Sequence, residues 1–147
     1  MLSGCALKTV DSCKYLGHVL SSVNDDNTDI IRQMSLLYAR ANVVIRQFSK
    51  CSRDVKLCLF RAHCIQFYGD ALWERFNINV QQRLEAAYVK CVKMFSGTAR
   101  RDSVTSMFCE LGLPTFNTTV FNAQYRLKNC VRQHDNLLIK HVFAICS

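Results

Sequence analysis

The sequence contains a single proline and only five glycines among its 147 residues, so it has few of the residues that build flexible linkers. It has no low-complexity stretch and no internal repeat. No apolar run approaches the ~20 residues that a helix needs to cross a bilayer. The N-terminus also lacks the long apolar stretch of a signal peptide. These absences exclude a membrane-spanning or repeat protein, and we expect an intracellular protein, nuclear or cytoplasmic, with no membrane partner.

The motifs of common enzymes and metal proteins are missing as well. The nine cysteines are irregularly spaced and include no C-x-x-C pair, and there is no G-x-S-x-G or glycine-rich phosphate loop. Cys58, Cys64 and Cys91 fall within apolar helical patterns, which predicts free thiols in the core of a reduced protein. The adjacent Asp25 and Asp26 are interpreted as a turn and helix start, since no third carboxylate completes a metal site. We therefore expect no catalytic residue, metal or cofactor on this chain.

What the sequence does have is apolar content and localised positive charge. Half of its residues are hydrophobic, which is enough to bury a core. The formal net charge is +8, and positions 40–101 hold 12 Lys/Arg against 4 Asp/Glu, while the remainder holds 7 of each. A localised excess of this kind favours a surface that faces a polyanion. The alternative is an ordinary solvated face of the protein.

The first part of the chain predicts two short strands and one long helix. Residues 7–10 and 15–20 are β-prone and flank Asp11-Ser12, which predicts an antiparallel hairpin with its turn there. A polar turn at 24–27 follows, with Asn27 or Thr28 as a helix cap. Apolar residues then recur at helical spacing over 29–49. The opposite face of this helix carries Arg32, Gln33, Arg40 and Gln47.

The rest of the chain predicts further helices. Residues 54–68 are apolar on nearly every side, which is typical of a helix that is buried all round or sandwiched between partners, and Gly69 interrupts or ends it. The later helices are expected over 80–95, ended by Gly97, over 103–111, capped by Ser103 and stopped by Gly112 and Pro114, and over 118–133 and 136–145. The fold class is mainly α, with a small N-terminal β-hairpin followed by a bundle of about five to six helices. The expected divisions are a hairpin at 1–24, a helical bundle at 25–100 and a helical extension at 101–147.

The candidate functional residues are the central cations, because Lys and Arg on exposed helix faces can follow phosphates without reading sequence. An aromatic side chain such as Tyr15 could stack on a base or sugar. Tyr68 and Trp73 could also stack, but aromatics at the end of an apolar helix more often pack in the core. The predicted nucleic-acid-binding residues are Lys14, Tyr15, Arg40, Arg46, Lys50, Arg53, Arg83, Lys90, Lys93, Arg100 and Arg101.

Several short segments occur in a fixed order along the chain. Lys14-Tyr15-Leu16-Gly17 is followed by an acidic turn and then by a helix with Arg32, Leu36, Ala39 and Arg40. The later segments are Lys56-Leu57, Phe67-Tyr68-Gly69 with Trp73, Arg83-Leu84-Glu85 running to Lys93-Met94-Phe95-Ser96-Gly97, and Glu110-Leu111-Gly112-Leu113-Pro114.

In content and order these segments resemble the reverse transcriptases of non-LTR (LINE-type) retrotransposons, in the region that follows the catalytic palm. The resemblance covers roughly residues 7–115. Where the family often has a proline before its Tyr-Gly, this chain has Gln66 and Phe67, and where the family has a glutamate it has Asp70 or Ala71.

The resemblance implies a thumb-like bundle that grips a template–primer duplex through phosphates, without sequence preference. It also implies that the hairpin lies near the primer end, and that the partners are the nucleic acid and a palm domain. The palm, with its Tyr-Ala-Asp-Asp motif, is absent from this sequence, so the chain would be a non-catalytic fragment of an RNA-directed DNA polymerase. The alternatives are an α-helical protein-interaction module, a decayed remnant without activity, or a small enzyme with an unrecognised site.

Overall fold

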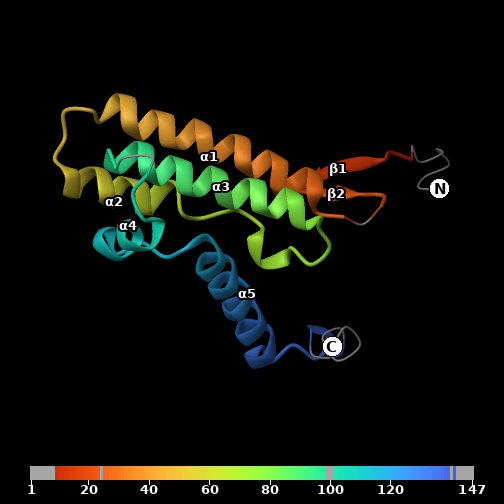
Figure 1. Cartoon of the computed structure of the whole chain (residues 1–147). Helices are drawn as coiled ribbons and strands as arrows, with labels where there is room; N and C mark the ends of the chain where they lie inside the picture. The colour runs from red at the N-terminus through yellow and green to blue at the C-terminus, as the bar shows by residue number, and fades with distance from the viewer. Residues whose placement is uncertain (1–8, 24, 99–100, 140, 142–147) are drawn as a thin grey trace.

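The computed structural model describes residues 9–23, 25–98, 101–139 and 141, and within them the chain is mainly helical, as the sequence predicts (Figure 1). A two-stranded antiparallel hairpin precedes the helices. The elements are β1 (Ser12–Tyr15), β2 (His18–Ser21), α1 (Asn27–Gln47), α2 (Arg53–His63), the 3-10 helix η1 (Asp70–Leu72), α3 (Ile78–Ser96), α4 (Val104–Leu111) and α5 (Phe116–Gln133). In the described residues, none of these helices combines the length and apolar character that crossing a membrane requires.

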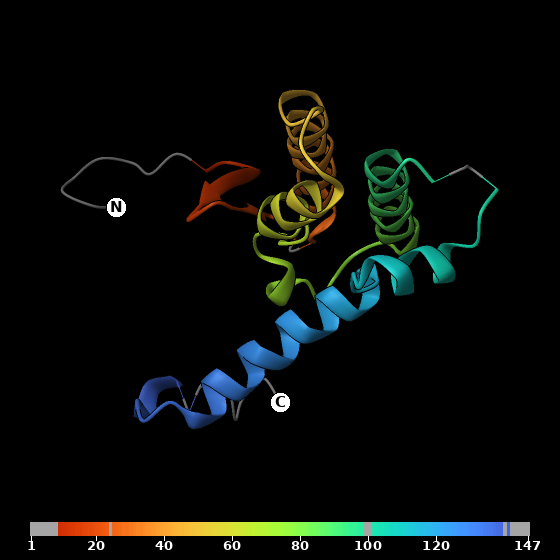
Figure 2. The same ribbon diagram turned by 90° about the vertical axis from the view of Figure 1, so that its left-hand side faces the viewer.

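Helices α1 and α3 form the centre of the molecule. They run side by side in the same direction, so their C-terminal ends lie at the same end of the molecule (Figure 1). Helix α2 returns along α1, and α4 lies beside α2 and the end of α3. Helix α5 starts at this body and then points away from it, as the turned view shows (Figure 2). The two long parallel helices therefore carry most of the core, and α5 projects from it.

The core is a single hydrophobic cluster to which all five α-helices contribute. Its centre is Tyr88 of α3, which is fully buried and stacks on Phe108 of α4 with ring centroids 5.7 Å apart. Phe67 meets the Tyr88 ring edge-on at 6.1 Å. The Tyr88 hydroxyl donates to the carbonyl of Pro114 at 3.0 Å, which satisfies its one polar group. Burial raises the pKa of this phenol well above its usual value, so it stays neutral.

Most helix ends form as the sequence predicts. Gly97 and Gly112 end α3 and α4 with φ of 69° and 58°, a left-handed conformation that glycine adopts without a Cβ penalty. The Ser103 side chain accepts a hydrogen bond from the Ser106 amide and caps α4. The cap expected at the start of α1 is wrong. Asp26 occupies that position, and its carboxylate accepts from the amides of Glu74 and Arg75 instead of capping the helix, while the Asn27 side chain accepts from the Asn77 amide before α3.

The hairpin is placed differently from the sequence prediction. Its turn is Leu16-Gly17 rather than Asp11-Ser12, and Tyr15 pairs directly with His18. Both turn residues have positive φ, 46° and 87°, which is the two-residue turn whose twist matches paired strands. The sequence does not indicate a turn at Leu16-Gly17, because leucine rarely adopts a left-handed conformation. Lys14 and Tyr15 therefore end a strand at the turn.

Helix α2 is shorter and more exposed than predicted. It ends at His63, and the residues that follow enter the core from a loop. Phe60 is its only wholly buried residue, whereas Val55 is 47% exposed and Cys58 is exposed. The prediction of a helix buried all round is therefore wrong, and so is the core position of Cys58. Of the predicted helix at 136–145, residues 137–139 and 141 are helical, and positions 140 and 142–145 lie outside the described residues.

The other two predicted core thiols are confirmed. Cys64 and Cys91 are buried. Burial raises the pKa of Cys64 to about 12 and that of Cys91 to about 11, so both remain neutral thiols that pack as small apolar groups. All the cysteines in the described residues are free.

Candidate nucleic-acid interface

The two most distinctive sequence segments, Lys14–Gly17 and Phe67–Trp73, meet in the folded chain. The hydroxyl of Tyr68 donates to the carbonyl of Leu16, 52 residues earlier. A Cβ at Gly17 would lie 2.7 Å from the Tyr68 ring, so a side chain does not fit there. These contacts hold the hairpin turn against the loop after α2. Because Tyr68 is 54% exposed, the expectation that it packs in the core is wrong.

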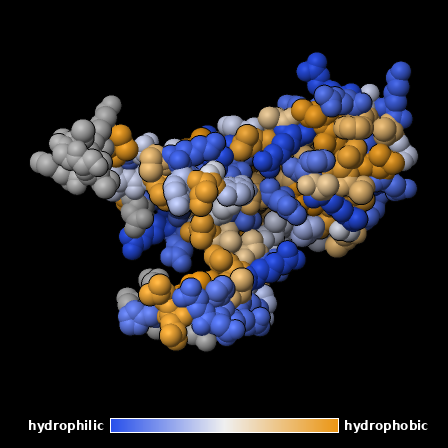
Figure 3. All heavy atoms as spheres, turned by 180° about the vertical axis from the view of Figure 1, so that it is seen from behind, coloured by the Kyte–Doolittle hydropathy of each residue, from blue (hydrophilic) through white to orange (hydrophobic). Residues whose placement is uncertain are grey.

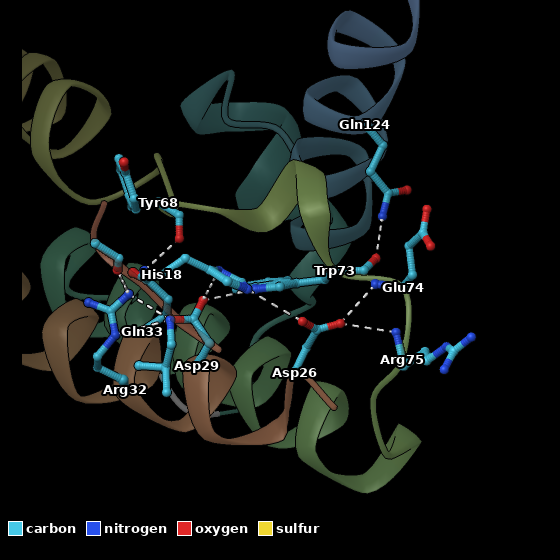
Figure 4. Close-up of polar contacts among 12 residues, drawn as sticks. His18, Asp26, Asp29, Arg32, Gln33, Tyr68, Trp73, Glu74, Arg75 and Gln124 are labelled. Carbon is cyan, nitrogen blue, oxygen red and sulfur yellow. Dashed lines mark hydrogen bonds and ion pairs between the residues drawn. The ribbon is translucent and has the colours of Figure 1, made fainter. Parts of the chain in front are cut away.

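The carboxylate of Asp29 joins the hairpin, α1 and the segment after η1 (Figure 4). Asp29 is fully buried, and one of its oxygens accepts from the Val19 amide at 3.3 Å and from the Arg32 guanidinium at 2.7 and 3.1 Å. Its other oxygen accepts from Nε1 of Trp73 at 3.1 Å. A buried carboxylate is tolerated only when it is paired and hydrogen-bonded in this way. Trp73 is 2% exposed, which confirms its predicted core position.

His18 lies between two carboxylates at the same junction. Its Nδ1 is 3.1 Å from Asp29 Oδ2 without the alignment of a hydrogen bond, and its Nε2 is 3.5 Å from Asp26 Oδ1. The other oxygen of Asp26 accepts from the amides of Glu74 and Arg75, each at 3.0 Å. These contacts connect the start of α1 to the chain that leads into α3. We call Asp26, Asp29, His18, Arg32 and Trp73 the junction cluster.

The predicted position of Gln33 on the outer face of the first helix is wrong. It was expected beside Arg32 and Arg40 on the polar side, but it is 1% exposed. Its Nε2 donates to the carbonyl of Tyr68 at 2.6 Å. That carbonyl lies in a loop and has no secondary-structure partner, so a buried side-chain donor satisfies it. Periodicity alone could not reveal this, because the partner is 35 residues away.

Asp70 and Glu74 do not lie one turn apart on a continuous helix, because α2 ends at His63 and Asp70 begins the short 3-10 helix η1. Asp70 is 7% exposed at the start of η1, while Glu74 is exposed. Burial raises the pKa of Asp70 to about 6, although backbone amides partly oppose the shift.

The predicted turn and helix start at Asp25 and Asp26 is confirmed, since Asp26 immediately precedes α1 and its carboxylate holds backbone amides. Across residues 9–23, 25–98, 101–139 and 141, no group of three or more His, Cys, Asp or Glu side chains is arranged to hold a metal ion. The junction cluster is a structural connection between segments rather than an open site.

Several of the predicted basic residues make contacts within the protein. Arg53 forms an ion pair with Glu110 of α4 at 2.7 Å. Arg40 donates to the carbonyl of Gln66 at 3.3 Å, and Lys93 donates to that of Asp102 at 3.0 Å. These contacts explain part of the central positive charge as packing and capping between helices.

Another group of cations gathers where α1 and α3 both end. Arg46 lies in the last turn of α1 and Lys93 in the last turn of α3, where positive charge offsets the negative end of each helix dipole. Lys50 follows α1 and is exposed, and Arg101 is exposed in the loop before α4. Lys14 and Tyr15 are exposed at the hairpin, which is far in the sequence from these four cations. Arg100 lies outside the described residues. The candidates therefore do not form one strip.

The candidates that the fold does bring together are Arg83, Lys90 and Lys93 on α3. At 3.6 residues per turn they fall within about 80° of one another around the helix. Arg83 and Lys90 are exposed, and the Lys90 ammonium lies 5.8 Å from the centre of the Tyr38 ring of α1. We call this set the α3 basic face. Beside it lies an open groove of about 810 Å³ that both lysines line, together with Gln82, Glu85, Val89 and Met94.

A scan against protein-family models finds no match for this chain, and comparisons with curated proteins and with solved structures find none either.

Proposed function

We propose that this chain is an intracellular nucleic-acid-gripping module, similar to the thumb of a retrotransposon reverse transcriptase, that contacts the phosphates of a duplex through the α3 basic face. The observation that carries the proposal is the alignment of Arg83, Lys90 and Lys93 on one side of α3, where the two lysines line an open groove. Their side chains extend from one rigid helix that is packed on the core through Leu84, Ala87, Tyr88 and Cys91.

The spacing of the three cations suits phosphates. A rise of 1.5 Å per residue places Lys90 about 10 Å and Lys93 about 15 Å along the helix from Arg83. Phosphates of one strand follow at about 3.4 Å along a duplex axis, so the face spans several phosphates. No base-reading side chain is needed for such contacts, which predicts binding without sequence preference.

The junction cluster supports the resemblance in a different way. Two of the segments that resemble the polymerase region contact each other, Leu16-Gly17 with Tyr68, and Trp73 of the second segment also contacts Asp29 at the start of α1. These contacts join the hairpin to the bundle. We assign the proposed contacts with phosphates to the α3 basic face.

The test is a titration of a fluorescent 20-base-pair duplex with the purified chain at several salt concentrations. With about three phosphates contacted, log K should fall with log salt at a slope of about −3. Replacing Arg83 and Lys90 by glutamine should reduce the slope by about 2 and weaken unrelated duplex sequences equally. The matched control replaces Arg75 and Arg126, two exposed arginines elsewhere, and should change the slope much less.

Two outcomes would contradict the proposal. One is a duplex affinity that does not depend on salt. The other is an equal loss of affinity in the α3 variant and in the control variant, because this would mean that only the net charge matters. Salt-insensitive association with a protein would instead favour the interaction-module alternative.

A further inference from the structure

Helix α5 is attached to the body only near its start. Phe116 and Val120 are its buried residues, and they join the common core. One turn further, Nε2 of Gln124 donates to the carbonyl of Trp73 at 3.0 Å. Beyond this point the helix points away from α1–α3 in both views (Figures 1 and 2). Most of the helix surface therefore has no neighbour in the described part of the chain.

An exposed pair of aromatic rings lies on this projecting helix. Phe121 is 65% and Tyr125 is 57% exposed, and their rings stack with centroids 6.3 Å apart and planes 16° from parallel. Seen from behind, apolar side chains are visible on the separate lobe that α5 and the following segment form (Figure 3). Adjoining exposed apolar side chains can mark an interaction surface, whereas single ones are ordinary.

Positive charge accompanies the aromatic pair. Helix α5 contains Arg126, Lys128 and Arg132 and no Asp or Glu. Positions 121, 125 and 128 fall within about 60° around the helix, so Lys128 continues the line of the two rings. Arg126 lies on a different side, about 160° from Lys128 around the helix. We call Phe121, Tyr125 and Lys128 the α5 stripe.

We propose that the α5 stripe binds single-stranded nucleic acid, with bases stacked on Phe121 and Tyr125 and a phosphate at Lys128. Aromatic rings with neighbouring cations are the pattern by which proteins hold single strands, since every base has a face that can stack. A helix without acidic residues complements a polyanion. The same charge opposes a second copy of α5, because two such helices would bring like charges together.

This inference rests on the proposed function, since it assigns the strand that leaves the duplex to a second surface. The two surfaces make separable predictions. The α3 basic face should determine affinity for a duplex, and the α5 stripe should determine affinity for a single strand.

The experiment measures fluorescence anisotropy of a labelled 15-nucleotide oligothymidine and of a 20-base-pair duplex with the full chain. Replacing Phe121 and Tyr125 together by alanine should weaken single-strand binding by about fivefold or more. Replacing both by leucine keeps apolar surface but removes the rings, and should weaken binding nearly as much. Circular dichroism of each variant should match the parent protein, because both side chains are exposed.

The charge is tested by a matched pair of single variants. Lys128→Ala should reduce the salt slope for the single strand by about 0.7. Arg126→Ala removes the same charge from another side of the helix and should leave the slope close to that of the parent. The variant with glutamine at 83 and 90 should lose duplex affinity and keep single-strand affinity.

Three results would overturn the inference. Full single-strand affinity in the alanine pair would show that the rings are not used. Full affinity in the leucine pair would show apolar contact without stacking. Concentration-dependent dimerisation in sedimentation that disappears in the alanine pair, without single-strand binding, would show that a second copy covers the rings. If the duplex also fails to bind, the proposed function fails with it, whereas duplex binding alone overturns only the α5 assignment.

Discussion

Gly69 provides the sharpest test of the junction cluster. Its φ is 88°, and a Cβ built there would lie 2.8 Å from Nδ1 of His18 and 3.5 Å from Oδ2 of Asp29. Gly69→Ala therefore meets two separate obstacles. The left-handed backbone costs an L-residue about 1–2 kcal/mol. The Cβ must also displace a buried imidazole that is held between Asp26 and Asp29.

The cost of displacing His18 can be separated from the backbone cost with a matched control. Gly97 also has a left-handed φ, 69°, but a Cβ there would have no atom within 4 Å. Gly97→Ala should therefore lower the free energy of unfolding by about 1–2 kcal/mol through the backbone alone. Displacing His18 leaves buried polar groups without good partners, which costs about 1–3 kcal/mol more. We expect Gly69→Ala to destabilise the protein by about 2–5 kcal/mol in total.

The assay is urea unfolding followed by the fluorescence of Trp73, the single tryptophan, which is buried in the junction. The two alanine variants should have similar m values and different midpoints. Adding His18→Ala to each should shrink the difference between them, because the obstructed group is gone. If the two variants differ by less than about 0.5 kcal/mol, within the scatter expected for independent sites, the steric reasoning is refuted.

Two further predictions concern buried polar groups. Trp73→Phe keeps most of the packed ring but leaves one Asp29 oxygen without its 3.1 Å donor, so the free energy of unfolding should fall by about 1–3 kcal/mol in urea unfolding followed by circular dichroism. Asp70→Asn should stabilise the protein at pH 7 and have little effect at pH 4. Because burial raises the folded pKa of Asp70 to about 6 from 3.8, the folded state binds the proton more tightly, and stability falls as pH rises from about 4 to about 6. The loss is at most about 3 kcal/mol, and unfolding midpoints at pH 4 and pH 7 measure it; an equal effect at both pH values would contradict the burial of the charge.

The long helices could be predicted from the sequence because local rules agree there. The apolar periodicity of α1 and α3 and the stop at Gly97 all favour the observed structure. At α2 the apolar pattern of the sequence is misleading. Apolar residues lie on every side, but the chain leaves the helix after His63 and supplies neighbours to one side only. Composition shows that a helix can be buried, and only the packing of other elements decides whether it is.

The junction cluster was beyond sequence reasoning because its partners are distant. Asp29 lies in the first turn of α1, where acidic residues are common, and in the sequence only its position three residues before Arg32 indicates an ion pair. Its contact with Trp73 spans 44 residues. Likewise, the helical positions of Phe121, Tyr125 and Lys128 can be read from the sequence, but their exposure depends on the direction in which α5 leaves the body.

The junction cluster changes what the sequence segments mean. Lys14–Gly17 and Phe67–Trp73 are the most distinctive parts of the chain, and their central residues contact one another. A substitution at Gly17, Gly69 or Trp73 would impair the proposed nucleic-acid binding through loss of the fold, even if none of them touched the ligand. Residues that act on a ligand must instead be exposed and dispensable for packing, a condition that Arg83 and Lys90 meet on α3 and that Phe121 and Lys128 meet on α5. Variants that lose binding and keep their unfolding midpoint therefore identify the binding surface, and variants that lose both identify the junction.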